Sequence, residues 1–152
     1  MIRFNYRLQP LLNVKRQMED MAKNDLAKKI IKLQEEQEKF NDVVNRKENC
    51  LDRIEEESAR GVSVGRLRQY NDYLYCINQK LQFQQKNVDI ASQEVEICRD
   101  KLIECVKEKK ILETLKDKKM QQYMEDMMRA EEKIVEEIVY SKFIASKEEV
   151  SS

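Results

Sequence analysis

The sequence predicts an all-α fold: two long helices that form an antiparallel coiled-coil hairpin, with the second helix longer than the first. Of the 152 residues 38% are charged and only two are glycine, a composition typical of long helices. The single proline, Pro10, stands near the start, so no locked φ angle interrupts a helix after it. Apolar residues at helical spacing lie on both sides of the two glycines. Together these features favour a single coiled-coil domain over residues 1–152.

The first helix is expected over about residues 5–59. Its apolar stripe includes polar interruptions and reads Leu8, Leu11, Lys15, Met18, Ala22, Leu26, Ile30, Leu33, Gln37, Phe40, Val44, Lys47, Leu51 and Ile54. The three successive steps of four from Met18 to Ile30 predict a stutter, which locally unwinds a supercoil. Oppositely charged residues four apart, such as Glu19 and Lys23, favour a solvated outer face.

A turn is expected at about residues 60–65, because Gly61 and Gly65 lie there and glycine accepts a positive φ angle. Ser63 is a candidate cap for the helix that follows. With the turn near residue 63, residues that face each other in an antiparallel pair have numbers that add to roughly 121–128.

The second helix is expected over about residues 66–145, and its apolar stripe is the clearest pattern in the chain. The spacing alternates between three and four, a period near 3.5 that predicts packing against another helix. Only Gln84 and Lys109 are polar among its positions. These positions are Leu67, Tyr70, Leu74, Ile77, Leu81, Gln84, Val88, Ala91, Val95, Cys98, Leu102, Cys105, Lys109 and Leu112.

The second helix is predicted to extend past its partner from about residue 124, and we call this part the overhang. One side of the overhang stays apolar, with Met127, Ala130, Ile134, Ile138, Phe143 and Ile144. An exposed apolar stripe usually marks a partner, and the alternatives are that it frays or pairs with the first few residues. The polar tail, residues 146–152, is expected to be disordered.

The composition argues against an enzyme. The absence of histidine excludes Ser-His-Asp and Cys-His catalytic sites and the usual zinc motifs, and two glycines cannot form a glycine-rich phosphate loop. We therefore expect no catalytic residue, no cofactor and no metal. The four cysteines have no CxxC spacing and are interpreted as small apolar residues. Unpaired thiols without an export signal favour the cytoplasm.

Charge and hydropathy also limit the partners. Acidic and basic residues balance at 29 each, so net charge gives no pull toward nucleic acid, and the lysines of residues 107–119 alternate with carboxylates. No run of 18 apolar residues occurs, so direct membrane insertion is not expected. After the turn, Tyr70 falls on the stripe, whereas Tyr73 and Tyr75 fall off it and are either interface anchors or packing residues.

Two segments at the ends of the chain form motifs. One is the opening Phe4-Asn5-Tyr6-Arg7-Leu8-Gln9-Pro10-Leu11-Leu12. The other comprises Glu108-Lys109-Lys110, Leu115-Lys116-Asp117-Lys118-Lys119, Tyr123, Glu131-Glu132-Lys133, Glu136-Glu137 and Phe143. They resemble the terminal signatures of the flagellar FliJ proteins, soluble components of the flagellar type III protein-export apparatus. Length and the two-helix layout agree with that family along the whole chain.

The resemblance implies a non-enzymatic stalk, similar to the coiled coil of the rotary ATP synthase gamma subunit, which inserts its paired termini into the hexameric export ATPase. The apolar overhang then implies that Met127, Ala130, Ile134 and Ile138 contact the ATPase. The family also binds the export-gate membrane protein and export chaperones at the inner membrane, and Tyr73 and Ile77 match its gate-contact positions. The alternatives are a scaffolding coiled coil that dimerises through its overhang, and the equivalent stalk of a virulence type III secretion system.

Overall fold

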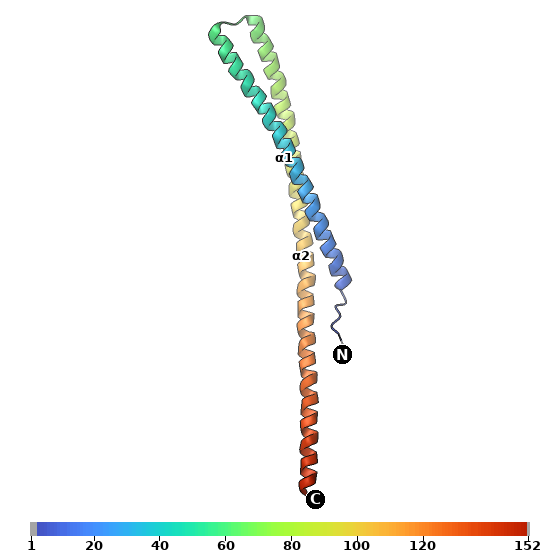
Figure 1. Cartoon of the computed structure of the whole chain (residues 1–152). Helices are drawn as coiled ribbons and strands as arrows, with labels where there is room; N and C mark the ends of the chain where they lie inside the picture. Colours follow the sequence, from blue (N-terminus) through green and yellow to red (C-terminus); the bar gives the residue numbers. More distant parts are fainter. Residues whose placement is uncertain (1–2, 152) are drawn as a thin grey trace. The chain divides into compact units, whose positions relative to one another are not determined.

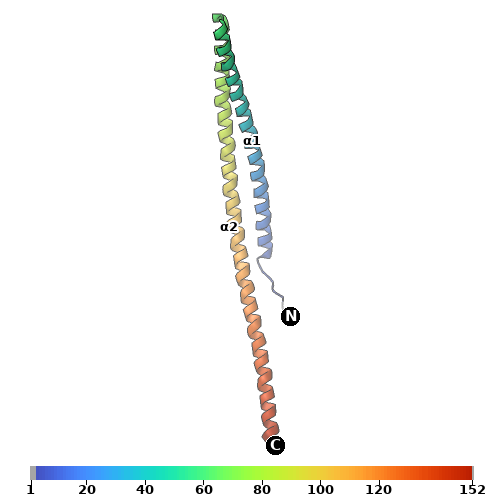
Figure 2. The same ribbon diagram turned by 60° about the vertical axis from the view of Figure 1, so that its left-hand side comes forward.

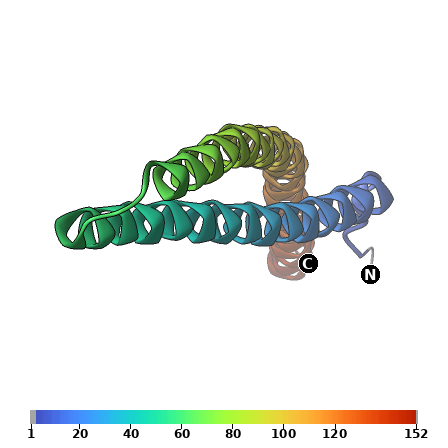
Figure 3. The ribbon, with the colours of Figure 1, turned by 90° about the horizontal axis from the view of Figure 1, so that it is seen from above.

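The computed structural model describes residues 3–151, and over that range it contains two α-helices and no strand. Helix α1 covers Gln9–Arg60 with 52 residues, and helix α2 covers Val64–Ser151 with 88 residues. Figures 1 and 2 show the two helices side by side and antiparallel, and Figure 3 shows the short connection between them from above. The predicted all-α antiparallel hairpin with a longer second helix is confirmed.

The chain divides into two compact units, each containing part of both helices. The tip unit is Gln17–Val106 and includes the connection between α1 and α2. The terminal unit combines the residues up to Arg16 with those from Lys107 onward. The predicted partner contacts therefore fall in different units, with Tyr73 and Ile77 in the tip unit and the overhang in the terminal unit.

The apolar stripe of α2 lies where the sequence predicts it. Each of the 14 predicted positions from Leu67 to Leu112 is buried or half-buried, including the two polar ones, Gln84 and Lys109. Gln84 is 8% exposed, and its side-chain amide donates hydrogen bonds to the backbone carbonyl and the carboxylate of Glu36. We call the contact line between the two helices the seam. The polar side chain of Gln84 can be buried in the seam because Glu36 accepts its hydrogen bonds.

The seam of α1 differs from the prediction. Four predicted positions are exposed, namely Leu11, Met18, Gln37 and Leu51. The less exposed residues are their immediate neighbours Leu12, Glu19, Glu36 and Cys50. With these neighbours, one series of buried and half-buried positions alternates between three and four from Leu12 to Glu57, and Ile30 and Val44 are half-buried beside it. Met18, where the predicted stutter begins, is exposed and Glu19 is buried, so the three successive steps of four are wrong and a heptad series continues from Leu12 to Glu57.

Charged residues occupy several of these seam positions because α2 supplies partners of opposite charge. In the terminal unit Lys15 Nζ lies 2.7 Å from Glu108 Oε2. In the tip unit Lys29 Nζ lies 3.1 Å from Glu94 Oε2. The residue numbers of each of these pairs add to 123, inside the predicted interval. Ion pairs thus contribute to the antiparallel alignment, and the spacing of apolar residues does not indicate these charged contacts.

The connection between the helices uses the predicted residue types. Gly61 has a φ angle of 91°, in the left-handed region that glycine occupies freely at the end of a helix. Ser63 caps α2, since its Oγ atom accepts a hydrogen bond from the backbone N–H of Arg66 at 3.3 Å. Residues 61–63 are non-helical and lie inside the predicted turn of residues 60–65. Gly65 is already part of α2.

The outer ends of both helices differ from the expected bounds. Helix α1 begins at Gln9 rather than near residue 5, which places Pro10 in the first turn, where its missing N–H costs nothing. Helix α2 continues to Ser151, so the expected disorder after residue 145 is not found up to that residue. Ser152 lies outside the described residues.

The non-helical opening of the chain packs against α2 within the terminal unit. Tyr6, Leu12 and Leu112 are buried together, and Phe4, Leu8 and Leu115 pack against them. The Tyr6 hydroxyl donates a 2.9 Å hydrogen bond to the carbonyl oxygen of Leu112, and the ring centroids of Phe4 and Tyr123 are 5.6 Å apart. The opening motif thus forms a small core that holds the start of α1 against α2.

Candidate partner-binding sites

The described residues show no constellation typical of catalysis or metal binding. Residues 3–151 contain no group of three or more histidine, cysteine or acidic side chains that could hold a metal ion. All four cysteines are free thiols, of which Cys50 is buried and Cys76 is exposed. Over the same residues, neither helix has a stretch long and apolar enough to cross a membrane. The surfaces with functional character are the overhang and two hollows near the turn.

The overhang is helical and without an intramolecular cover. From Met128 to Ser151 every described residue is exposed, and Figures 1 and 2 show no neighbouring helix beside this part of α2. Of the predicted contact residues, Met127 is half-buried and Ala130 is exposed, while Ile134 and Ile138 are 56% and 50% exposed. The geometry therefore presents three of the four predicted side chains to solvent.

The apolar band of the overhang is wider than the predicted stripe. Additional exposed side chains are Met124, Val135, Val139 and Tyr140. The sequence could have indicated these residues, because apolar residues four apart, such as Val135 and Val139, lie beside the predicted stripe. Between Met124 and Val139 six carboxylates and two basic residues surround the band. The overhang thus combines an apolar surface with an acidic border.

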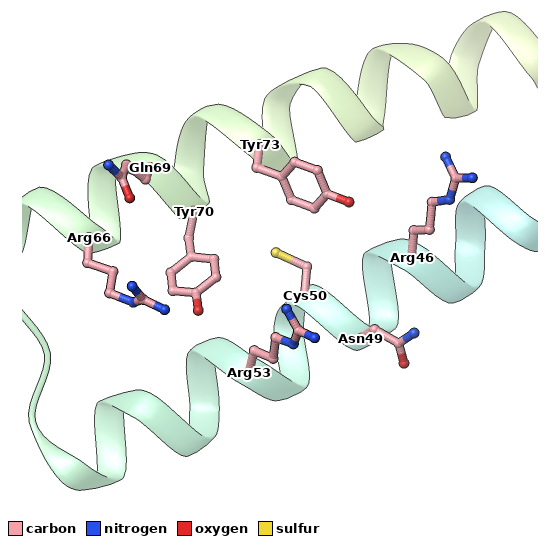
Figure 4. Close-up of a pocket in the computed structure, with 8 residues that line it drawn as sticks. All are labelled: Arg46, Asn49, Cys50, Arg53, Arg66, Gln69, Tyr70 and Tyr73. Atoms are coloured by element: carbon pink, nitrogen blue, oxygen red, sulfur yellow. The ribbon is translucent and has the colours of Figure 1, made fainter.

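A groove near the turn, shown in Figure 4, is lined by residues from both helices of the tip unit. Its volume is about 450 Å³, and its lining consists of Arg46, Asn49, Cys50, Arg53, Arg66, Gln69, Tyr70 and Tyr73. Tyr73 is 48% exposed, so its ring is accessible to a partner. Tyr70 is half-buried beside it, which agrees with its predicted place on the stripe.

Ile77, the other predicted gate-contact residue, lies in the seam. Its side chain is only 2% exposed, so it is covered by the packing of the two helices. A buried isoleucine stabilises the hairpin near the turn but offers no surface to a partner in this conformation. Of the two predicted residues, the structure leaves Tyr73 as the accessible one.

The tip groove, as we call it, is positively charged. The guanidinium of Arg66 donates two hydrogen bonds to the carboxylate of Glu57, at 2.7 and 2.8 Å, and stands 5.7 Å from the centre of the Tyr70 ring. The hydrogen bonds from Arg66 hold the pKa of Glu57 below its ordinary value, and the same contact raises the pKa of Arg66. In residues 3–151 Arg46 and Arg53 form no ion pair, and no carboxylate lines the groove.

Arg46 and Arg53 lie outside the sites predicted from the sequence. Arg46 and Arg53 are seven residues apart, which places both on one face of α1, and that spacing was the available signal. A second hollow of about 700 Å³ in the same unit has an apolar lining that includes Phe40, Val44, Leu51 and Leu81. Leu51 borders this hollow, whereas Cys50 occupies the seam position that the sequence predicted for Leu51.

Comparison with known proteins identifies the family of this chain. A family model described as "Flagellar FliJ protein" matches residues 4–148. Among solved structures, the chain is similar to that of a protein from Chlamydia trachomatis described as a YscO homologue, CT670, with 25% sequence identity and a TM-score of 0.65. That similarity covers 97% of this chain and 99% of the other. The comparison with curated proteins gave no match. The family match includes both the small core around Tyr6 and Leu112 and the tip groove, and the chain belongs to the flagellar FliJ protein family.

Proposed function

We propose that this FliJ-family protein is a non-enzymatic stalk of the flagellar type III export apparatus that binds the hexameric export ATPase through its terminal unit. We further propose that the tip unit binds the membrane export gate and that the protein assists the handling of export chaperones. Membership of the family supports a role in flagellum biogenesis and type III export. The proposed location is the cytoplasm, at the inner face of the membrane that holds the export gate.

The observation that carries the ATPase contact is the uncovered apolar band of the overhang. Helix stability in proteins comes mainly from packing an apolar face, and residues 128–151 have no such packing within the chain. Contiguous exposed apolar surface on a helix is typical of a partner-binding face. The acidic border favours a partner wall in which apolar residues are flanked by basic ones.

The methionines of this region suit a ring-shaped partner. Met120, Met124 and Met128 are all exposed, and methionine has a flexible, polarizable side chain that adapts to different surfaces. A stalk inside a hexamer meets six walls that are not identical in position, so adaptable contacts are an advantage. The core around Tyr6 and Leu112 would hold the start of α1 against α2 at the same end.

The stalk of a virulence type III secretion system is the second candidate, and the likeness to a YscO homologue over nearly the whole chain favours it. That secretion protein is the counterpart of the flagellar one, so the same architecture serves both systems. Identification of the neighbouring genes would distinguish them, because flagellar structural genes beside this one would support the flagellar assignment.

The ATPase contact is tested with Ile134→Asp, which places a carboxylate in the apolar band. We expect this variant to lose retention by a purified flagellar export ATPase in a pull-down, because a charge would be buried without a partner. Its thermal midpoint should stay close to that of the wild type, since Ile134 is 56% exposed. Ser146→Asp adds the same charge at an exposed polar position and should bind normally.

Two results would contradict this assignment. An Ile134→Asp protein that melts much earlier and still binds the ATPase would show that the overhang is folded core. A wild-type dimer that the same substitution converts to a monomer in sedimentation equilibrium, with no ATPase retained by either protein, would instead support the scaffolding alternative.

A further inference from the structure

We propose that the tip groove binds an extended acidic segment of a partner protein, with two carboxylates paired to Arg46 and Arg53. The proposal deepens the tip contact described above and to that extent rests on the proposed function. It concerns the chemistry of the bound segment, which neither the fold nor the family match specifies. The groove is one continuous hollow of about 450 Å³ formed by both helices, within the size range of ligand-binding clefts.

The charge of the groove points to an anionic ligand. Three of its eight lining residues are arginines and none is acidic. Glu57 neutralises Arg66 through the two hydrogen bonds described above, so that side chain is occupied. Arg46 and Arg53 are exposed and form no ion pair over residues 3–151, so their guanidinium groups remain available for carboxylates, with Glu57 attracting Arg53 only at longer range. Arginine suits this role because its planar fork can donate two parallel hydrogen bonds to one carboxylate.

The spacing of the two arginines specifies the form of the ligand. Residues seven apart in α1 are separated by about 10 Å along the helix axis, at 1.5 Å per residue. In a polyproline II segment, residues three apart lie on the same side and are separated by about 9 Å. An extended acidic segment with carboxylates at every third position therefore matches Arg46 and Arg53 without bending.

The remaining lining residues favour the same extended conformation. Tyr70 and Tyr73 come from α2 and face the arginines of α1 across the groove in Figure 4. Grooves lined by aromatic rings bind polyproline II segments in several peptide-recognition domains, since the rings pack against the extended chain. Asn49 and Gln69 supply amide groups for the peptide backbone. Cys50 is 5% exposed, and its small side chain contributes to the floor.

The test measures binding of fluorescein-labelled synthetic peptides to the full chain by fluorescence anisotropy. The probe is a proline-rich peptide with glutamate at every third position, and the matched control has glutamine instead. We expect the glutamate peptide to bind and its affinity to fall as salt is added. The variant Arg46→Gln/Arg53→Gln should weaken that binding by about tenfold or more, while Arg46→Lys/Arg53→Lys keeps the charge and should retain part of it.

Arg68→Gln is the matched control, since Arg68 is exposed, lies near the turn and does not line the groove. It should leave peptide affinity unchanged. Equal binding of the glutamine peptide, or an equal loss with Arg68→Gln, would overturn the proposal, the latter by showing only general attraction to the tip. Circular dichroism of each variant confirms that the helices are intact.

A parallel pull-down with the export-gate protein separates this inference from the proposed function. If the wild type retains the gate protein but the glutamate peptide does not bind, the acidic-segment inference fails and the gate contact stands. If the peptide binds through Arg46 and Arg53 but the gate protein is not retained, the groove chemistry stands and the identity of the partner is wrong.

Discussion

Tyr6 donates a hydrogen bond from its hydroxyl group to the backbone carbonyl oxygen of Leu112, 106 residues further along the chain. Tyr6 lies before the start of α1, so the contact ties the non-helical opening to the middle of α2. The Tyr6 side chain is 4% exposed, and the hydrogen bond removes the cost of burying its hydroxyl group. The opening motif is therefore part of the structural core of the terminal unit.

Tyr6→Phe should lower the free energy of unfolding by about 0.5–1.5 kcal/mol, the usual range for one intramolecular hydrogen bond. The ring stays in place, so the change isolates the hydroxyl. Urea denaturation followed by circular dichroism measures the difference. Tyr140→Phe removes a hydroxyl from a residue that is 66% exposed and should leave stability unchanged. Equal effects of the two substitutions would contradict the role of the buried hydrogen bond.

The two adjacent leucines at the start of α1 test the register. Leu12 is 0% exposed and Leu11 is 43% exposed, although the apolar pattern of the sequence favoured Leu11. Leu12→Ala should destabilise the chain by about 2–5 kcal/mol, as for other buried leucines. Leu11→Ala should cost less than about 0.5 kcal/mol. The reverse order of thermal midpoints would restore the register predicted from the sequence.

Acid should weaken the tip unit through Glu94. Hydrogen bonding and attraction from Lys29, with a smaller contribution from Lys32, hold the pKa of Glu94 below its ordinary value of 4.5. A lowered folded-state pKa contributes stability above the unfolded value, and that contribution is lost as pH falls through the folded value. The urea midpoint of the wild type should therefore decrease below about pH 4.5. Glu94→Gln should decrease less, and an identical pH profile would remove Glu94 from this role.

Tyr73→Ala tests the proposed gate contact on the tip. The substitution removes an accessible ring from the groove, so we expect weaker retention of the export-gate protein with unchanged helix content. Tyr75→Ala is the matched control, because Tyr75 is 64% exposed and does not line the groove. Normal retention by the Tyr73→Ala protein would reduce Tyr73 to a packing residue near the turn.

The sequence predicts the seam of α2 correctly because apolar residues occupy nearly every seam position of that helix. In α1 the apolar pattern selects Leu11, Met18 and Leu51, which are exposed. The residues that lie in the seam are their neighbours Leu12, Glu19 and Cys50. Two of the missed seam residues, Glu19 and Glu36, are carboxylates, and hydropathy alone assigns carboxylates to the surface. Glu36 accepts hydrogen bonds from Gln84 of α2, a partner that becomes visible only when the second helix is placed.

In the candidate sites, too, the features of a single helix are predictable from the sequence, whereas those that depend on both helices are not. The exposed face of Ile134 and Ile138 follows from spacing and from the unequal helix lengths, both of which are local properties of the sequence. The burial of Ile77 and the groove lined by Arg46 depend on how α1 and α2 pack together. The periodicity of a single helix carries no information about that packing. A pattern along one helix identifies its apolar face but not which side chains the other helix covers.

The uncovered part of α2 also has a kinetic consequence. Residues 128–151 continue a helix that is already paired further back, so their helix forms by propagation and avoids the costly first turn. Without packing, the same helix should open from its C-terminal end inward, and its amide protons should exchange with solvent in a gradient that slows toward Tyr123. An occupied partner site would flatten that gradient, which makes hydrogen exchange a direct measure of how far along α2 a partner reaches.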